Sequence, residues 1–82
     1  MKLFLISQTV NVGYDTFDSA VVAAPNEEAA ALMYPGDGES ILTYAYATNS
    51  WVKDPKLVTV KYIGQAARGT KAGVICSSFN AG

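Results

Sequence analysis

Few residues of this chain have side chains suited to catalysis, and the densest group lies at residues 13–19. Asp15 and Asp18 stand three positions apart there, so the pair could bind Mg²⁺ or Ca²⁺, or act as an acid and a base. Aspartates at this spacing in a turn more often accept hydrogen bonds from the nearby backbone. We therefore predict neither a catalytic site nor a metal site at this pair.

The composition removes most other catalytic and metal-binding arrangements. The 82 residues include no histidine, which is the commonest general base and zinc ligand. They include one cysteine, Cys76, which cannot form an intrachain disulfide and whose strand-like neighbours predict burial. The glycines at residues 36–38 and 69–71 match neither dinucleotide-binding nor P-loop spacing. We predict a protein that is not an enzyme and holds no cofactor.

The side chains of residues 13–19 are better suited to recognition of a partner than to catalysis. The two aromatic rings offer contact area at a low cost in side-chain entropy, and the carboxylates favour a cationic partner. One or both rings could instead pack beneath the stretch, and the choice between core residue and exposed anchor is also open for Trp51. The candidate partner-binding residues are Tyr14, Asp15, Thr16, Phe17, Asp18, Trp51, Phe79 and Asn80.

Length and charge indicate the broad class of the protein. Eighty-two residues make one domain with a small core, and the net charge of −1 gives no reason to expect nucleic-acid binding. Residues 1–52 carry six acidic side chains and one basic, whereas residues 53–82 carry one acidic and five basic. These charges could pair across strands or stay solvated, or the basic half could dock on an acidic partner. No apolar run has membrane-spanning length, and a lone cysteine suits a reducing cytosol.

Strand patterns occupy both ends of the chain and must position the candidate residues. Residues 3–8 and 19–24 are apolar on both faces, as in central strands, and the long connection between them would carry the candidate site. Residues 57–63 alternate between apolar and polar side chains, and residues 74–79 form a last strand. A polar loop of hairpin character, residues 64–73, joins these two strands.

A helix is predicted between the two pairs of strands. Asn26 is a suitable N-cap, Pro35-Gly36 would end the helix, and Leu32 and Met33 are among the side chains that would face the sheet. Residues 36–49 could form a strand, irregular structure or a helical extension.

The predicted fold class is α+β. The order ββαββ packs most simply as an antiparallel four-stranded sheet with one short helix on a face. Because one short helix cannot cover both faces, the second face would need residues 36–52, a second copy of the chain, or a partner protein.

Four segments of the chain carry a resemblance to a known family. They are Val10-Asn11-Val12-Gly13-Tyr14-Asp15-Thr16-Phe17-Asp18-Ser19-Ala20-Val21-Val22-Ala23-Ala24 with Asn26-Glu27-Glu28-Ala29 after it, Trp51-Val52, Val58 to Gly64, and Gly73-Val74-Ile75-Cys76-Ser77-Ser78-Phe79-Asn80-Ala81-Gly82. These segments resemble short proteins of tailed bacteriophages and prophages, whose functions are mostly unassigned. The resemblance implies a setting, the cytoplasm of an infected bacterium. By analogy with other small phage proteins it suggests an inhibitor of host defence, such as an anti-CRISPR protein.

We expect a non-catalytic module that binds a bacterial host protein, a defence component, through residues 13–19 with support from Phe79 and Asn80. It could act as a homodimer or higher oligomer. A second hypothesis is an oligomeric sponge for a nucleotide messenger. Tyr14, Phe17 or Trp51 would stack on the base, and Arg68 or Lys71 would neutralise the phosphate. A third is a minor structural protein of the virion.

Overall fold

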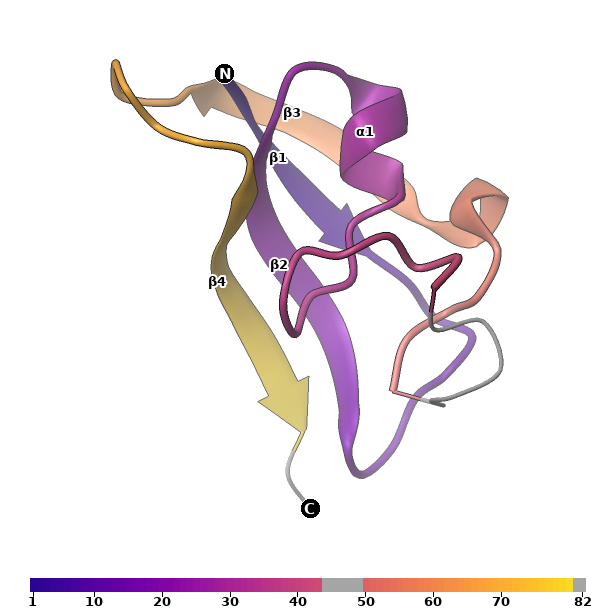
Figure 1. Cartoon of the computed structure of the whole chain (residues 1–82). Helices are drawn as coiled ribbons and strands as arrows, with labels where there is room; N and C mark the ends of the chain where they lie inside the picture. Colours follow the sequence, from indigo (N-terminus) through magenta and orange to yellow (C-terminus); the bar gives the residue numbers. More distant parts are fainter. Residues whose placement is uncertain (44–49, 81–82) are drawn as a thin grey trace.

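Four strands and one short helix are found in the part of the chain that the computed structural model describes, residues 1–43 and 50–80. The strands form one antiparallel sheet in the order β3-β1-β2-β4, and the helix packs on one face (Figure 1). The elements are β1 (Lys2–Ser7), β2 (Thr16–Ala24), α1 (Glu27–Ala31), the 3-10 turn η1 (Pro55–Leu57), β3 (Thr59–Gln65) and β4 (Gly73–Asn80). The predicted α+β fold is confirmed. Within these residues no helix is long and apolar enough to cross a membrane.

Side-chain alternation places the two central strands between a core face and a second face. In β1, Phe4 and Ile6 are buried on the face that carries α1, whereas Leu5 is half-buried on the other face. β1 pairs with β2 in continuous register, with Leu5 opposite Val21. Each of these strands also pairs with an outer strand, so the polar backbone groups on both of their edges find partners within the sheet.

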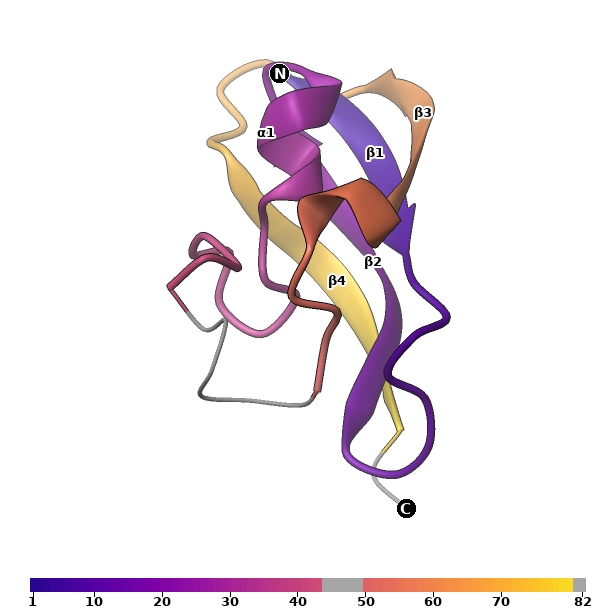
Figure 2. The same ribbon diagram turned by 90° about the vertical axis from the view of Figure 1, so that its right-hand side faces the viewer.

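The hydrophobic core lies between the sheet and the segments that cover its first face. It contains Phe4, Ile6, Ala20, Val22 and Ala24 from the sheet, and Ala30, Met33, Ile41, Trp51, Val52 and Val58 from the covering segments. Figure 2 shows α1, the segment after it and η1 along the same side of the sheet. One helix of five residues therefore covers only part of the core, and irregular segments cover the rest.

The helix is shorter than the sequence pattern predicts. Asn26 caps it as expected, but α1 ends at Ala31. The residues that follow pair with a later segment instead, since the N–H of Ile41 donates to the carbonyl oxygen of Leu32 over 2.7 Å. Pro35 restricts only Tyr34, the residue before it, so the earlier end at Ala31 is attributed to this pairing and not to the proline.

Other boundaries also differ from the predictions. The strand expected at residues 57–63 runs from Thr59 to Gln65, because Leu57 belongs to η1. β2 begins at Thr16 rather than at Ser19, so the second half of the 13–19 stretch is strand rather than loop. Of the region predicted to be strand, irregular or helical, residues 41–43 form a turn. Residues 44–49 lie outside the described part of the chain.

The link between β3 and β4 is not a hairpin. β3 pairs with β1 and β4 pairs with β2, so the two strands lie on opposite edges of the sheet. Residues 66–72 therefore cross the end of the sheet (Figure 1). The hairpin prediction for residues 64–73 was wrong because consecutive strands usually pair or lie side by side, and a polar loop does not reveal the exception.

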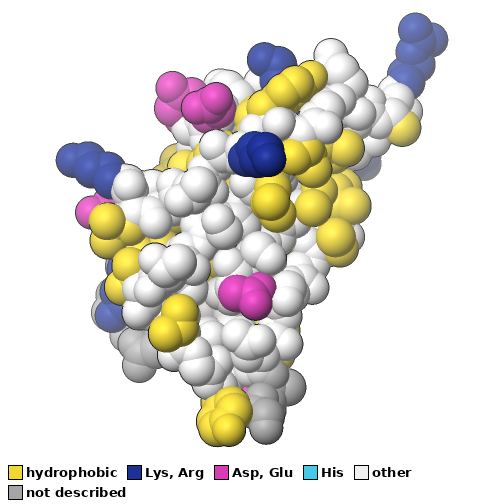
Figure 3. Space-filling model, turned by 180° about the vertical axis from the view of Figure 1, so that it is seen from behind, with side chains coloured by type: hydrophobic (Ala, Val, Ile, Leu, Met, Phe, Trp, Pro, Cys, Tyr) yellow, Lys and Arg dark blue, Asp and Glu magenta, His cyan; other side chains and the backbone are white. Residues whose placement is uncertain are grey.

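The second face of the sheet stays partly exposed. The described parts of residues 36–52 lie on the first face, where Ile41 and Trp51 join the core, so they do not provide the predicted cover. Cys76, which was predicted to be buried, is exposed because it lies opposite Val21 on this second face. Figure 3 shows hydrophobic side chains gathered on the back of the molecule. A second copy and a partner protein remain as candidate covers.

Candidate partner-binding site

The connection between β1 and β2, residues 8–15, is organised by the side chain of Gln8. This amide is only 4% exposed. Its Oε1 accepts hydrogen bonds from the backbone N–H groups of Val10 at 2.9 Å and Asn11 at 2.8 Å. Its Nε2 donates to the carbonyl oxygens of Asn11 at 2.7 Å and Phe17 at 2.9 Å. All four hydrogen-bonding positions of the amide are used, as its burial requires.

A second set of hydrogen bonds ties the connection to the segment that precedes η1. The Nδ2 of Asn11 donates to the carbonyl oxygen of Trp51 over 2.6 Å, and the N–H of Phe17 donates to that of Ser50 over 2.8 Å. Trp51 is itself 1% exposed, so packing of its side chain in the core holds its backbone in place. The connection is thus attached to the core, and little conformational entropy remains to be lost when a partner binds.

The far end of the connection is a tight turn with two left-handed residues. Gly13 has a φ of +114° and Asp15 a φ of +60°. Aspartate is one of the non-glycine residues that tolerate this region best. The hydroxyl of Thr16 donates to the carbonyl oxygen of Gly13 over 2.8 Å, and the N–H of Asp15 donates to that of Asn80. The turn is therefore bound to both β2 and β4.

Apolar side chains project from the outer surface of this ordered connection. Tyr14 is 79% exposed, Val12 68% and Val10 55%. Beside Val10 lies a groove of about 310 Å³ that Leu57 also lines. A group of exposed apolar side chains on a restrained backbone is typical of a contact surface. Their contact with water is unfavourable, and a partner can bury them.

The structure separates the predicted partner-binding residues into two groups. Those that are exposed are Tyr14, Asp15, Asp18, Phe79 and Asn80. Thr16 is 6% exposed. The ring of Phe17 packs edge-on against that of Tyr34, with centroids 5.7 Å apart, and tilted against that of Phe79 at 4.8 Å. Of the two rings in the 13–19 stretch, that of Phe17 is therefore packed against other side chains and that of Tyr14 is exposed. Trp51 lies in the core, so the alternative of an exposed anchor does not hold.

Sequence reasoning alone does not single out the residues that shape this site. By its place in the sequence Gln8 ends an apolar strand, and nothing in its neighbours shows that its amide will bond to residues as distant as Phe17. Asn11 likewise forms its bond to a residue in another segment. The available signal is the sequence Asn11-Val12-Gly13, which indicates a turn but not its partners.

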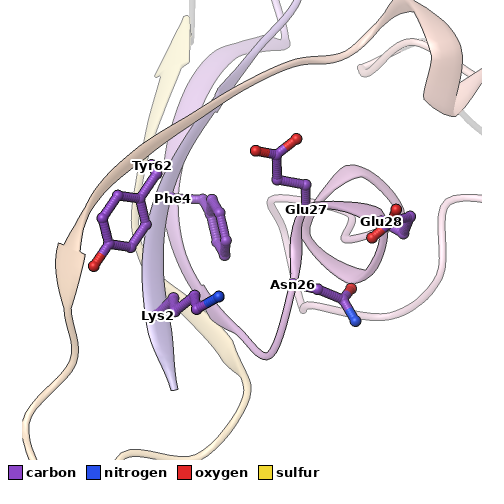
Figure 4. A pocket seen from close by; sticks show the side chains of 6 residues that line it. All are labelled: Lys2, Phe4, Asn26, Glu27, Glu28 and Tyr62. Carbon is purple, nitrogen blue, oxygen red and sulfur yellow. The ribbon is translucent and has the colours of Figure 1, made fainter.

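A second hollow, of about 440 Å³, lies between the start of α1 and the sheet. It is lined by Lys2, Phe4, Asn26, Glu27, Glu28 and Tyr62 (Figure 4). Phe4 and Tyr62 pack edge-on with centroids 5.8 Å apart on the sheet side, and the two glutamates lie on the helix side. Two carboxylates with one ammonium do not suit a phosphate. In the described ranges, no three side chains of His, Cys, Asp or Glu come together in a way that could hold a metal ion.

The groups considered for a nucleotide ligand do not meet within one copy of the chain. Tyr14 lies in the connection that follows the Ser7 end of β1, whereas Arg68 and Lys71 lie in the connection at the Lys2 end. Figure 1 shows these two connections at opposite ends of the sheet. One copy therefore offers no place where Tyr14 stacks on a base and these cations reach its phosphate.

Comparison of the chain with family models, with curated proteins and with solved structures finds no match. The resemblance to short phage proteins stays a prediction from the sequence.

Proposed function

We propose that the protein is a small phage-encoded accessory module that binds a bacterial host protein, a component of host defence, and inhibits it without catalysis. The single observation that carries the proposal is the exposure of Tyr14, 79%, on a connection whose backbone is held by Gln8, Asn11 and Thr16. Tyrosine is enriched among the residues that contribute most to binding. A tyrosine on an ordered backbone loses little entropy when it is buried by a partner.

The contact surface consists of Val12, Tyr14, Asp15, Phe79 and Asn80. The backbone hydrogen bond from Asp15 to Asn80 joins the connection to the end of β4, so these residues lie on neighbouring stretches of backbone although they come from both ends of the chain. Phe79 is 46% exposed and adds a second ring. The apolar side chains of the contact surface and the carboxylate of Asp15 suit a partner that offers an apolar pocket with basic residues around it.

The setting of the proposal comes from the sequence resemblance. The quoted segments include residues 10–24 and 73–82, which contain every residue of the contact surface. A phage protein without catalytic groups can act on host defence by occupying a surface that the defence protein needs. The host cytoplasm is where such a partner would be met.

The test compares wild type with the double variant Tyr14→Ala, Asp15→Asn in a bacterium whose defence system restricts a phage. Asparagine is chosen because it tolerates the left-handed backbone of Asp15. We expect wild type to raise phage plating by at least about tenfold. The double variant should not raise phage plating, and it should not capture from host lysate the partner that wild type captures.

The matched control is Tyr62→Ala, which removes a half-exposed tyrosine from β3 and leaves the contact surface unchanged. It should keep both inhibition and capture. If wild type and the double variant capture the same proteins in equal amounts, the contact surface is not where the partner binds and the proposal fails.

A further inference from the structure

The outer edge of β4 is an unpaired row of backbone hydrogen-bonding groups. β4 pairs with β2 on one side, and no strand of the described chain pairs with its other side (Figure 1). From Ile75 to Asn80 every residue of β4 is exposed. Gly73 and Val74 are half-buried, and the turn at Gly38 approaches them, with a Cβ built at Gly38 lying 3.6 Å from the Cα of Gly73. Another extended strand is the chemical group that satisfies such an edge.

The opposite edge of the sheet, β3, has features that discourage the addition of another strand. Most of β4 lacks such features. β3 carries Lys61, and a register shift interrupts its pairing with β1 near Phe4. Charged side chains and bulges on an edge strand hinder the addition of another strand. The sequence of β4, GVICSSFN, contains neither a charge nor a proline. Its pairing with β2 has two register shifts: the extra residue of one, Ile75, lies in β4, and that of the other, Asp18, lies in β2. The regular part of its free edge is therefore Cys76–Asn80.

We propose that two copies of this chain pair through β4, antiparallel, about a twofold axis at Ser78. Ser78 is the middle residue of the regular segment Cys76–Asn80, so this register uses the longest uninterrupted stretch of the edge. Ser78 then lies opposite Ser78 of the second copy, and Ser77 lies opposite Phe79 in both directions.

The charges at the two ends of β4 favour a second copy over an unrelated strand. Arg68 and Lys71 precede its first residue. Asp15 and Asp18 flank its last residues, Asp15 through its hydrogen bond to Asn80 and Asp18 through the register beside that end of β4. Antiparallel pairing reverses one copy, so the acidic end of each copy is turned toward the basic end of the other. The segment in contact is uncharged, so no like charges meet at the axis.

The first test measures molar mass by sedimentation velocity from micromolar to submillimolar concentration. Wild type should approach twice the monomer mass of 8.7 kDa as concentration rises. Ser78→Lys alone and Ser78→Glu alone should stay monomeric, because each places like charges opposite one another, and their equimolar mixture should regain the dimer. The control Thr59→Lys on the opposite edge should dimerise as wild type does. Far-ultraviolet circular dichroism checks that each variant is folded.

The second test maps the register by cysteine cross-linking. Ser78→Cys in a Cys76→Ser background should form a disulfide between copies on oxidation, because opposed residues in antiparallel strands have Cα atoms roughly 4.5–5.5 Å apart. Wild type should not cross-link through Cys76, since the two Cys76 residues would be about 13 Å apart along the strands. Cross-linking of wild type but not of the Ser78→Cys variant overturns the register. A wild type that stays monomeric throughout overturns the pairing and leaves the edge to a strand of another protein.

Discussion

The two connections at opposite ends of the sheet differ in what the fold demands of them. Residues 66–72 must pass from one edge of the sheet to the other, a distance of three strand spacings or roughly 14 Å. Residues 8–15 join strands that are already neighbours, a task that hairpin loops of about two to five residues perform. The longer connection between neighbours is therefore not required by topology.

The hydrogen bonds of the two connections differ in the same sense. In the 66–72 connection, hydrogen bonds lie at one end of the sheet: the N–H of Ala66 donates to the carbonyl oxygen of Met1, and Thr70 donates to that of Ala67. The 8–15 connection is bonded through Gln8 and Asn11 to β2 and to the segment before η1. Restraint beyond what topology needs is expected of a surface that must keep one shape for a partner.

The largest expected effect comes from breaking the restraint at Gln8. Gln8→Leu removes four hydrogen bonds and leaves partly buried backbone groups without these partners, so we expect the free energy of unfolding to fall by about 3 kcal/mol. For a domain of this size that is most of the expected stability, roughly 3–5 kcal/mol. Urea denaturation followed by tryptophan fluorescence measures it, because Trp51 is buried.

The matched control is Gln65→Leu, which changes the exposed glutamine at the end of β3 where the other connection begins. Its effect should stay within about 0.5 kcal/mol. Equal losses at Gln8 and Gln65 would show that the two connections are restrained alike and would contradict the comparison.

The fold was accessible from the sequence because the two-sided apolar pattern of residues 3–8 and 19–24 marks central strands. Asn26 was identified as a cap for the same kind of local reason. The end of the helix and the path of residues 66–72 depend on pairing between distant segments, Leu32 with Ile41 and β4 with β2, which no local pattern records.

The candidate site was predicted in outline only. Side-chain type singles out Tyr14 and the two aspartates, but not which ring turns inward. Phe17 packs against Tyr34, which follows the helix, and against Phe79, in the last strand. A contact among three separate segments has no signature in the sequence of any one of them.

Two threonines sharpen the comparison because they form the same bond in the two connections. Thr16 donates to the carbonyl oxygen of Gly13 at 2.8 Å, and Thr70 to that of Ala67 at 2.6 Å. Thr16 is buried, so Thr16→Val should cost about 1–2 kcal/mol, whereas water can replace the bond in Thr70→Val and the cost should be at most about 0.5 kcal/mol. Urea denaturation of the two variants measures the difference, and a larger loss at Thr70 would reverse the conclusion.

Glycine substitutions test where the connections should behave alike. Gly13 and Gly69 have φ values of +114° and +87°, and a Cβ at either would have no atom within 4 Å. Gly13→Ala and Gly69→Ala should therefore each cost about 1 kcal/mol through backbone strain alone. Thermal denaturation compares them. A much larger loss at Gly13 would mean that contacts of the turn, and not its backbone geometry, limit substitution there.

The smallest expected effect on stability belongs to the residue that matters most for the proposed function. Tyr14 is 79% exposed, so Tyr14→Ala removes little buried area and should change the free energy of unfolding by less than about 0.5 kcal/mol. The hydrogen bonds of Gln8, Asp15 and Thr16 remain, so the connection should keep its shape, which amide chemical shifts of residues 8–12 would report. A variant that binds no partner while its stability and these shifts are unchanged separates recognition from folding. A fall of more than about 1 kcal/mol in the free energy of unfolding would instead show that Tyr14 stabilises the fold. Its exposed ring could then no longer be taken as a group whose role is to contact a partner.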